Sequence, residues 1–223
     1  MMEFVYKCSE CEKEYPIEPD VMLCPVCREK QEQNRPLRGI LEVEMKGAFS
    51  ESSSIFDVLP IEKSYFPEIP VGNTPLWVSA NLQNKLGLPN LLIKDDTRNP
   101  TGSYKDRASW LVAAFAKKWG IKNITVASTG NAASSMAGIG AAAGLNVTIF
   151  VPENVPKAKL IQSLQYGARV LLVKGSYDKA FQLSMQYKPE GDSINRNTGF
   201  NPLTIEGKKT VAFELCHQLK ATP

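Results

Sequence analysis

The sequence predicts an α/β protein in which a parallel sheet is covered by helices on both faces and a small cysteine-rich ribbon precedes the sheet. Beyond residue 120, short apolar runs alternate with segments of helical periodicity, as in parallel strands connected by helices. Near the start of the chain, four cysteines form two closely spaced pairs. We therefore divide the chain into a ribbon-like segment, 1–35, and a larger region, 36–223.

The cysteine pairs have the spacing of a metal knuckle. Cys8 and Cys11 form one pair, Cys24 and Cys27 form the other, and twelve residues separate the pairs. Four thiolates on two short turns suit tetrahedral zinc. Disulfides or four unrelated cysteines are the alternatives, and a reducing compartment disfavours the first. So short a segment has no core of its own, so we expect the zinc to be structural and needed for folding.

Composition and charge narrow the class of protein. With 43% hydrophobic and 22% charged residues, the 223-residue chain has the composition of an ordinary globular protein with a core. A net charge of +3 is too small to favour nucleic acid, and acidic residues surround the cysteine pairs. The single histidine, His217, argues against histidine-dyad chemistry. The start of the chain lacks the apolar segment of a secretory signal, which predicts a cytoplasmic location.

Uncharged residues fill the stretch 123–152, but they do not predict a membrane span. Alanine, glycine and serine dominate it, whereas real spans are rich in large apolar residues. We interpret it as a buried strand–helix–strand unit. Its glycine-rich part, 138–144, lies inside the expected helix, whereas dinucleotide-binding glycines follow a strand, so it predicts close helix packing.

The elements expected in order are a short strand over 90–94, a helix after residue 104 that ends at Gly120, and then three strand–helix pairs. The three strands are expected at 124–127, 147–151 and 169–173, and the three helices at 132–144, 157–166 and 177–187.

Residues 99–107, Asn-Pro-Thr-Gly-Ser-Tyr-Lys-Asp-Arg, form a turn that opens a helix. Ser103 and Asp106 have the spacing of a capping box, which makes Ser103 the N-cap and puts Lys105 in the first turn. The helix dipole disfavours a positive charge there and predicts a lowered lysine pKa. A lysine that is easily neutral can react with a carbonyl. The alternative is a solvated surface lysine.

Residues 128–132, Ser-Thr-Gly-Asn-Ala, lie where the first of these strands gives way to a helix. Free backbone N–H groups and the helix dipole make such a corner an anion site, and ligands bind at the carboxyl ends of parallel strands. An ordinary capped helix is the alternative.

Three stretches together resemble one family. Residues 99–107 resemble the cofactor-lysine motif of pyridoxal-phosphate enzymes of the tryptophan-synthase-β fold type, and of threonine synthases in particular. Residues 72–76, Gly-Asn-Thr-Pro-Leu, resemble the entry motif of that fold type, and residues 128–131 resemble its Ser-x-Gly-Asn motif. Some threonine-synthase-like chains also carry an N-terminal cysteine knuckle.

The resemblance implies roles for five residues. Lys105 would carry pyridoxal 5'-phosphate and move protons on the substrate carbons. Ser128, Thr129, Asn131 and Ala132 would bind the α-carboxylate of a small amino-acid substrate, with Asn131 also contacting the ring oxygen of the cofactor.

The implied function is that of a threonine-synthase-like lyase, which acts on an amino acid by elimination or replacement and converts phosphohomoserine to threonine by family default. A cysteate-synthase-like β-replacement, an amino-acid ammonia-lyase and a non-catalytic interaction module are the alternatives. Residues 201–210 resemble a further threonine-synthase stretch, but Thr198, Gly199 and Thr204 stand where the family keeps the Asn, Ser and Arg that bind phosphate. Losing a bidentate arginine predicts weak turnover of phosphohomoserine.

The resemblance covers residues 8–215 but only the first half of such an enzyme. It makes 36–223 the N-terminal half of an incomplete fold-type-II catalytic region, and it implies a homodimer for the full-length form. The glycine-rich cradle for the cofactor phosphate belongs to the later half, so we expect residues 1–223 alone to be inactive.

Overall fold

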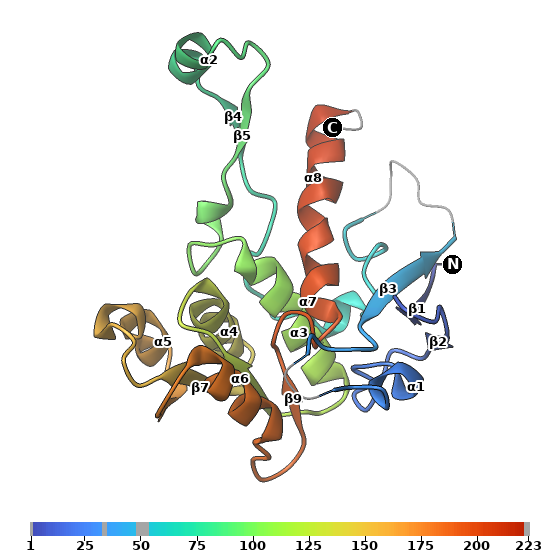
Figure 1. The fold of residues 1–223 in the computed structure, drawn as a ribbon. Coiled ribbons are helices and arrows are strands. Elements are labelled where there is room, and N and C mark those ends of the chain that lie inside the picture. The colour runs from blue at the N-terminus through green and yellow to red at the C-terminus, as the bar shows by residue number, and fades with distance from the viewer. Residues whose placement is uncertain (1, 33–34, 48–53, 221–223) are drawn as a thin grey trace.

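The computed structural model describes residues 2–32, 35–47 and 54–220. Three parts are visible in Figure 1: an N-terminal antiparallel sheet, a parallel sheet with its helices, and an arm that projects away from both. No described helix is long and apolar enough to cross a membrane.

A four-stranded parallel sheet carries the larger part of the molecule. Its strand order is β8-β7-β6-β9, and all three pairings are parallel. The strands are β6 (Asn123–Ala127), β7 (Asn146–Pro152), β8 (Arg169–Val173) and β9 (Ser193–Asn195). The first three confirm the strands that the sequence predicts, whereas β9 was not predicted.

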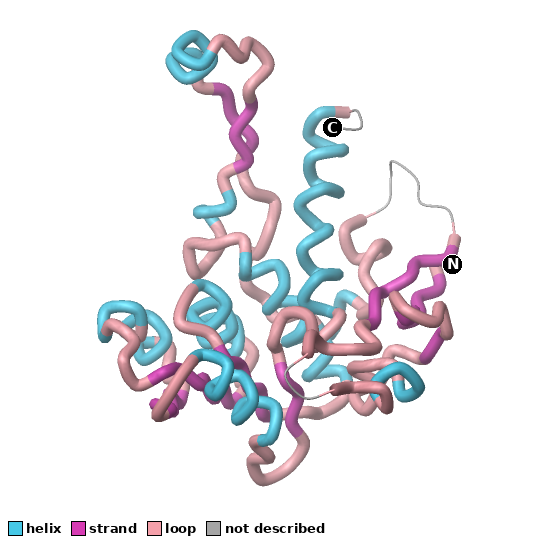
Figure 2. Tube along the Cα trace, viewed as in Figure 1, coloured by secondary structure: helices cyan, strands magenta, loops and turns pink. Residues whose placement is uncertain are grey.

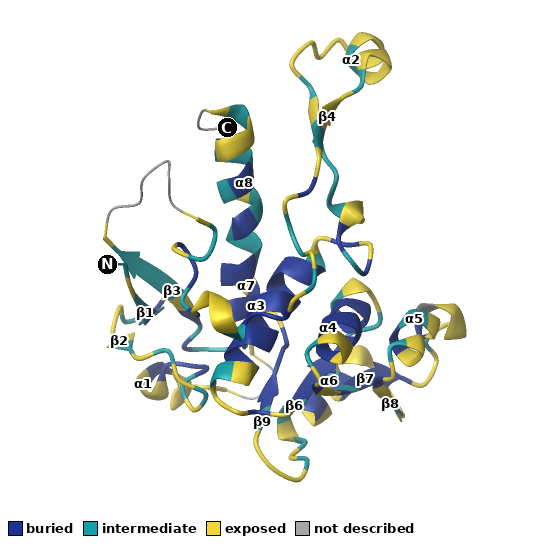
Figure 3. Cartoon of the chain, turned by 180° about the vertical axis from the view of Figure 1, so that it is seen from behind, coloured by how far each residue is buried: buried dark blue, intermediate teal, exposed yellow. Residues whose placement is uncertain are grey.

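Helices cover both faces of this sheet, which confirms the predicted fold class. Val126 of β6 belongs to one apolar cluster with Met136 of α4, and the next residue, Ala127, belongs to another with Ala180 of α6. Side chains alternate across a strand, so the two clusters lie on opposite faces. The helices are α3 (Lys105–Lys118), α4 (Asn131–Ala142), α5 (Ile161–Gln165) and α6 (Tyr177–Gln186). In Figure 3, α3 is dark blue at the centre of the molecule.

The expected capping box at the start of α3 is wrong, although Lys105 does lie in the first turn. Tyr104 occupies the N-cap position and makes no side-chain capping bond. The Asp106 carboxylate instead accepts hydrogen bonds from the N–H and hydroxyl of Thr101, at 2.7 and 2.5 Å. Asp106 therefore closes the turn before the helix rather than capping it, and the Ser103 hydroxyl accepts from the Lys105 N–H at 3.3 Å.

Glycines in α4 allow its close packing, as the sequence predicts. A Cβ on Gly138 would lie 2.6 Å from Cγ2 of Thr101, and one on Gly140 would lie 2.5 Å from Cγ2 of Val147. Either contact is far shorter than a van der Waals distance, so α4 approaches the sheet and the 99–107 turn only because these side chains are missing.

The N-terminal sheet has the order β2-β1-β3, and it carries the cysteine segment. Strand β3 lies beyond residue 35 but pairs with β1 along its whole length. Strand β3 also contacts α7, so this sheet is packed against the larger region. The elements are β1 (Glu3–Cys8), β2 (Glu14–Tyr15), α1 (Pro25–Arg28), β3 (Leu41–Lys46) and α7 (Leu203–Glu206).

The arm consists of two antiparallel strands with a helix at the tip (Figure 2). Its apolar side chains include Trp77, Leu82 and Leu86, all exposed. Its elements are β4 (Leu76–Val78), α2 (Ala80–Leu86) and β5 (Leu92–Lys94). The remaining elements are η1 (Lys63–Tyr65), η2 (Asp96–Arg98), η3 (Lys157–Lys159), η4 (Gly207–Lys209) and α8 (Thr210–Leu219).

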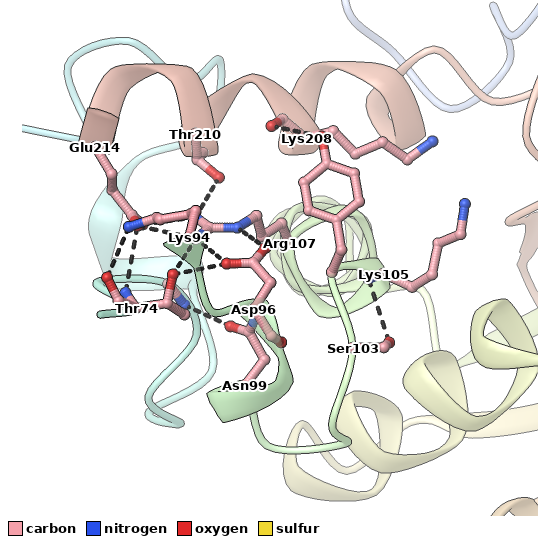
Figure 4. A network of polar contacts seen from close by, with 12 residues as sticks. Thr74, Lys94, Asp96, Asn99, Ser103, Lys105, Arg107, Lys208, Thr210 and Glu214 are labelled. Carbon is pink, nitrogen blue, oxygen red and sulfur yellow. Dashed lines mark hydrogen bonds and ion pairs between the residues drawn. The ribbon is translucent and has the colours of Figure 1, made fainter. Parts of the chain in front are cut away.

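A fully buried arginine, Arg107, joins the base of this arm to α3 and α8 (Figure 4). Its guanidinium donates to the Asp96 carboxylate at 2.7 and 2.8 Å and to the Glu214 carboxylate at 2.6 and 2.9 Å. It also donates to the hydroxyls of Thr74 and Thr210, each at 3.1 Å. The guanidinium is thus bonded to four residues from three separate segments, since Thr210 and Glu214 both belong to α8.

The two carboxylates are held ionised by this network. Burial opposes the charge of Glu214, but hydrogen bonds from Arg107 and Lys94 outweigh it and lower the Glu214 pKa below 4.5. Burial likewise opposes the charge of Asp96, and Arg107 and Thr74 lower its pKa below 3.8. A depressed carboxyl pKa stabilises the fold above the ordinary pKa and stops doing so as the pH falls through the depressed value.

We expect Arg107→Met to lower the free energy of unfolding by about 3–5 kcal/mol at neutral pH, because it leaves two buried carboxylates without their cation. Urea unfolding measures this. Arg98→Met, at an exposed arginine nearby, is the control and should change little.

The pH dependence separates this cause from a simple loss of packing. The difference between Arg107→Met and the unchanged chain should shrink as the pH falls through about 4, because protonation removes the unpaired negative charges. A difference that stays constant with pH would contradict the ion-pair explanation.

Candidate active site

The strand order reverses at one place in the parallel sheet, between β6 and β9. The chain runs from β6 outward to β7 and β8 and then returns to place β9 on the other side of β6. In open parallel sheets, ligands bind outside the carboxyl ends of the strands at such a reversal. Residues 128–131 follow β6 and residues 196–198 follow β9, so these two segments form the expected crevice.

A cavity of about 100 Å³ lies at this reversal. Ser128 and Ala132 line it from the β6 side, and Arg196 and Thr198 line it from the β9 side. The amide oxygen of Asn197 accepts a hydrogen bond from the Ala127 N–H at 2.7 Å, which ties the two strand ends together.

The start of α4 can accept an anion. Gly130 is its N-cap residue, and no side chain caps the helix. The Gly130 N–H donates to the Ser128 hydroxyl at 3.2 Å, and a Cβ on Gly130 would meet nothing within 4 Å. The first N–H groups of α4 are therefore not blocked by a capping side chain, and they carry the positive end of the helix dipole.

Lys105 begins α3, and its side chain projects away from the Arg107 network in Figure 4. Helices α3 and α4 touch through the hydroxyls of Ser109 and Ser135, 2.7 Å apart. Lys105 and Asn131 each lie four residues, about one helical turn, before these serines.

The five predicted cofactor and substrate residues do not share one cavity, and Lys105 itself does not line the cavity at the strand reversal. Asn131 lines a cavity of about 640 Å³ together with Ser103 and Tyr104, the two residues before Lys105. Ser128 and Ala132 line the smaller cavity, and Thr129 lies partly exposed between Ser128 and Gly130. An amine at the start of α3, directly after the two residues that share a cavity with Asn131, fits a pyridoxal cofactor.

Two further cations lie near Lys105 and were not predicted as site residues. Arg196 is fully buried, and burial lowers its pKa to about 10, while Asp106 acts in the opposite direction. Burial, and then the charges of Lys105 and Arg196, lower the pKa of Lys208 to about 8. Lys208 lies in residues 201–210, which resemble a threonine-synthase stretch, but that resemblance did not predict that Lys208 lies near Lys105.

The four predicted metal-binding cysteines lie together. Their sulfur atoms are all within 4.8 Å of one another, with Cys8 to Cys27 at 3.8 Å and Cys11 to Cys24 at 3.6 Å. Four sulfurs bound tetrahedrally at about 2.3 Å from one metal ion stand about 3.8 Å apart. The cluster therefore has the dimensions of a tetrahedral metal site.

The family of pyridoxal-phosphate dependent enzymes matches residues 68–223, which is more than half of the chain. The threonine synthase of Methanocaldococcus jannaschii is 32% identical over 96% of this chain and 54% of its own length. That of Halalkalibacterium halodurans is 40% identical over 68% of this chain and 43% of its own. The chain thus spans about half the length of the curated relatives it matches.

Solved structures share the fold. Maize serine racemase superposes with a TM-score of 0.60 at 25% identity, over 67% of this chain and 45% of that one. The processed form of threonine deaminase isoform 2 from Solanum lycopersicum gives 0.60 at 24% identity, over 78% and 48%. The parallel sheet, the lysine at the start of α3 and these similarities agree, and the chain belongs to the family of pyridoxal-phosphate dependent enzymes, in which it is threonine-synthase-like.

Proposed function

We propose that this chain forms part of a lyase that uses pyridoxal 5'-phosphate to act on an amino acid by elimination or replacement. The observation that carries the proposal is the position of Lys105 at the start of α3, one turn from the contact with α4, whose own N-terminus is uncapped. A nucleophilic amine and an anion site are thus next to each other.

The chain's own residues would divide the work. The Lys105 amine holds the cofactor and afterwards carries protons to and from the substrate carbons. Asn131 orients the cofactor through its ring oxygen, while Ser128, Thr129 and Ala132 hold the substrate α-carboxylate at the start of α4. The bound cofactor supplies an electron sink.

Conversion of phosphohomoserine to threonine is the first reaction to assay, because the curated relatives carry the name threonine synthase. A cysteate-synthase-like replacement and an ammonia-lyase reaction are the other outcomes of that assay. A homodimer and a cytoplasmic location remain predictions. So does the inactivity of residues 1–223 alone, and measurable turnover by this polypeptide would contradict it.

Peptide mapping after borohydride reduction tests the role of Lys105. In a protein carrying this sequence and loaded with pyridoxal 5'-phosphate, we expect the pyridoxyl label on Lys105, because no other lysine combines the helix start with the neighbouring α4 terminus among the residues that the structure describes. Lys105→Ala should lose the label, whereas Lys117→Ala, in the last turn of the same helix, should keep it. A label on a different lysine would rule out the proposal.

We further propose that the ribbon-like segment, 1–35, binds one structural zinc ion through Cys8, Cys11, Cys24 and Cys27. The sulfur–sulfur distances near 3.8 Å support a tetrahedral ion of this size. Three of the four cysteines are buried, so the site offers no open position for a substrate.

Metal analysis of the purified protein should find one zinc per chain. Cys27→Ser should weaken zinc binding by more than about 100-fold, because it removes a thiolate ligand. Cys216→Ser is the matched control, since Cys216 lies in α8 outside the cluster, and it should retain the metal. Equal zinc content in the two variants would refute the assignment.

A further inference from the structure

The four-cysteine cluster of the ribbon would carry more negative charge than one zinc ion offsets. Four thiolates around one Zn²⁺ ion leave a net charge of about −2. Three of the four cysteines are buried, and negative charge in such a place is costly unless hydrogen-bond donors face it. The groups that donate to the four sulfur atoms therefore contribute to the stability of the occupied site.

Two backbone N–H groups and one hydroxyl face these sulfur atoms in the described part of the chain. The Glu10 N–H donates to Cys8 Sγ at 3.4 Å, and the Cys27 N–H donates to Cys24 Sγ at 3.5 Å. The hydroxyl oxygen of Tyr15 lies closer, at 3.1 Å from Cys24 Sγ. Apart from the cysteines themselves, Tyr15 is the only described residue whose side chain forms a hydrogen bond with a sulfur of the cluster.

The direction of this hydrogen bond follows from the charge of a ligand sulfur. A hydroxyl and a free thiol can each donate to the other, but a sulfur that binds zinc is a thiolate and has no proton. In the occupied site the Tyr15 hydroxyl is therefore the donor, and Cys24 Sγ is the acceptor. A hydrogen bond to an ionised acceptor is about twice as strong as one between neutral groups.

Both partners of this hydrogen bond are held in place by the backbone. Tyr15 is the last residue of β2, and it pairs with Tyr6 of β1, which is fully buried. Cys24 is the N-cap residue of α1, and its N–H donates to the Gly39 carbonyl at 2.7 Å. Because Tyr15 follows the first cysteine pair and Cys24 begins the second, their hydrogen bond joins the two halves of the cluster.

The neighbouring cation, Arg38, does not perform the same role. Cys27 is among the charges that act on Arg38, but the guanidinium donates to the Glu10 carboxylate at 2.6 and 3.0 Å. The charge of Arg38 is thus already paired with a carboxylate. Within the described ranges, Arg38 also forms no hydrogen bond with a sulfur of the cluster, whereas Tyr15 does.

We propose that Tyr15 is a positioning residue of the metal site, whose hydroxyl donates to the Cys24 thiolate and thereby helps to retain the ion. The proposal rests on the zinc site proposed above. Removing a group that hydrogen-bonds a metal ligand typically weakens metal binding by about 10–100-fold. For the single hydroxyl of Tyr15 we expect the lower end of this range, about tenfold.

Cobalt(II) substitution in the full protein that carries this sequence tests the hydrogen bond directly. The d–d bands of bound Co²⁺ report on a tetrahedral sulfur site, and the sulfur-to-cobalt charge-transfer bands report on the electron density of the thiolates. Tyr15→Phe removes only the hydroxyl, so the d–d bands should persist while the charge-transfer bands shift to longer wavelength. Zinc affinity, measured by competition with a chelator, should fall by about tenfold.

Tyr6→Phe is the matched control. Tyr6 is the residue that pairs with Tyr15 across β1 and β2, and its hydroxyl has no hydrogen-bond partner among the residues that the structure describes. Its loss should leave the charge-transfer bands and the zinc affinity unchanged. Because each variant removes one hydroxyl from the same pair of strands, a general loosening of the sheet would affect both variants alike.

Unchanged charge-transfer bands in Tyr15→Phe, or an equal shift in Tyr6→Phe, would overturn the proposal. The zinc assignment fails separately, if the unchanged chain binds neither zinc nor cobalt, and the role of Tyr15 then fails with it. A tetrahedral cobalt spectrum that is identical in the unchanged chain and in Tyr15→Phe would leave the zinc site standing and remove only the role of Tyr15.

Discussion

The buried charge of Arg107 is the constraint on which the candidate site depends. A guanidinium without solvent persists only where carboxylates and hydroxyls surround it, and here they come from segments up to 107 residues away. The same network requires a glycine at residue 72, in the segment 72–76. A Cβ on Gly72 would lie 2.5 Å from a Glu214 oxygen, and Gly72 has a φ of +81°, which favours glycine. Since Arg107 follows Lys105 by two residues, the interaction that joins these segments also fixes the helical turn that carries the lysine.

At the end of β6, side chains rather than a further strand bond to the backbone that borders the site. Asn197 accepts from the Ala127 N–H and donates to the Ser184 hydroxyl at 2.9 Å, and the Tyr177 hydroxyl donates to the Ala127 carbonyl at 3.0 Å. The backbone at the end of β6 is thus satisfied by α6 and by the segment after β9. This arrangement leaves residues 128–131 free to turn into α4, and it places Arg196 in the buried wall of the same crevice.

Patterns within short stretches of the sequence predicted those elements that short-range interactions determine. Apolar runs in the sequence predicted the strands at 124–127, 147–151 and 169–173. The spacing of the cysteine pairs predicted the cluster that the structure shows. Strand β9 has only three residues, two of them polar, so its pairing with β6 depends on tertiary context. The capping box failed because Asp106 has a nearer partner in Thr101, which a spacing rule cannot reveal. The sequence likewise did not predict that the charges of Lys105 and Arg196 act on Lys208, because the three residues come from separate segments.

The cysteine ribbon contacts the segment that carries Lys208 through packed elements. Strand β1 ends at Cys8 and pairs with β3 along its whole length, from Glu3 opposite Lys46 to Cys8 opposite Leu41. Strand β3 contacts α7, and the Lys209 ammonium lies 5.7 Å from the centre of the Phe4 ring while it pairs with Glu206. The sheet that the metal would fix therefore supports α7 and η4, and η4 carries Lys208. Residues 128–132 are attached to β6 instead, so the ribbon supports η4 more directly than it supports the start of α4.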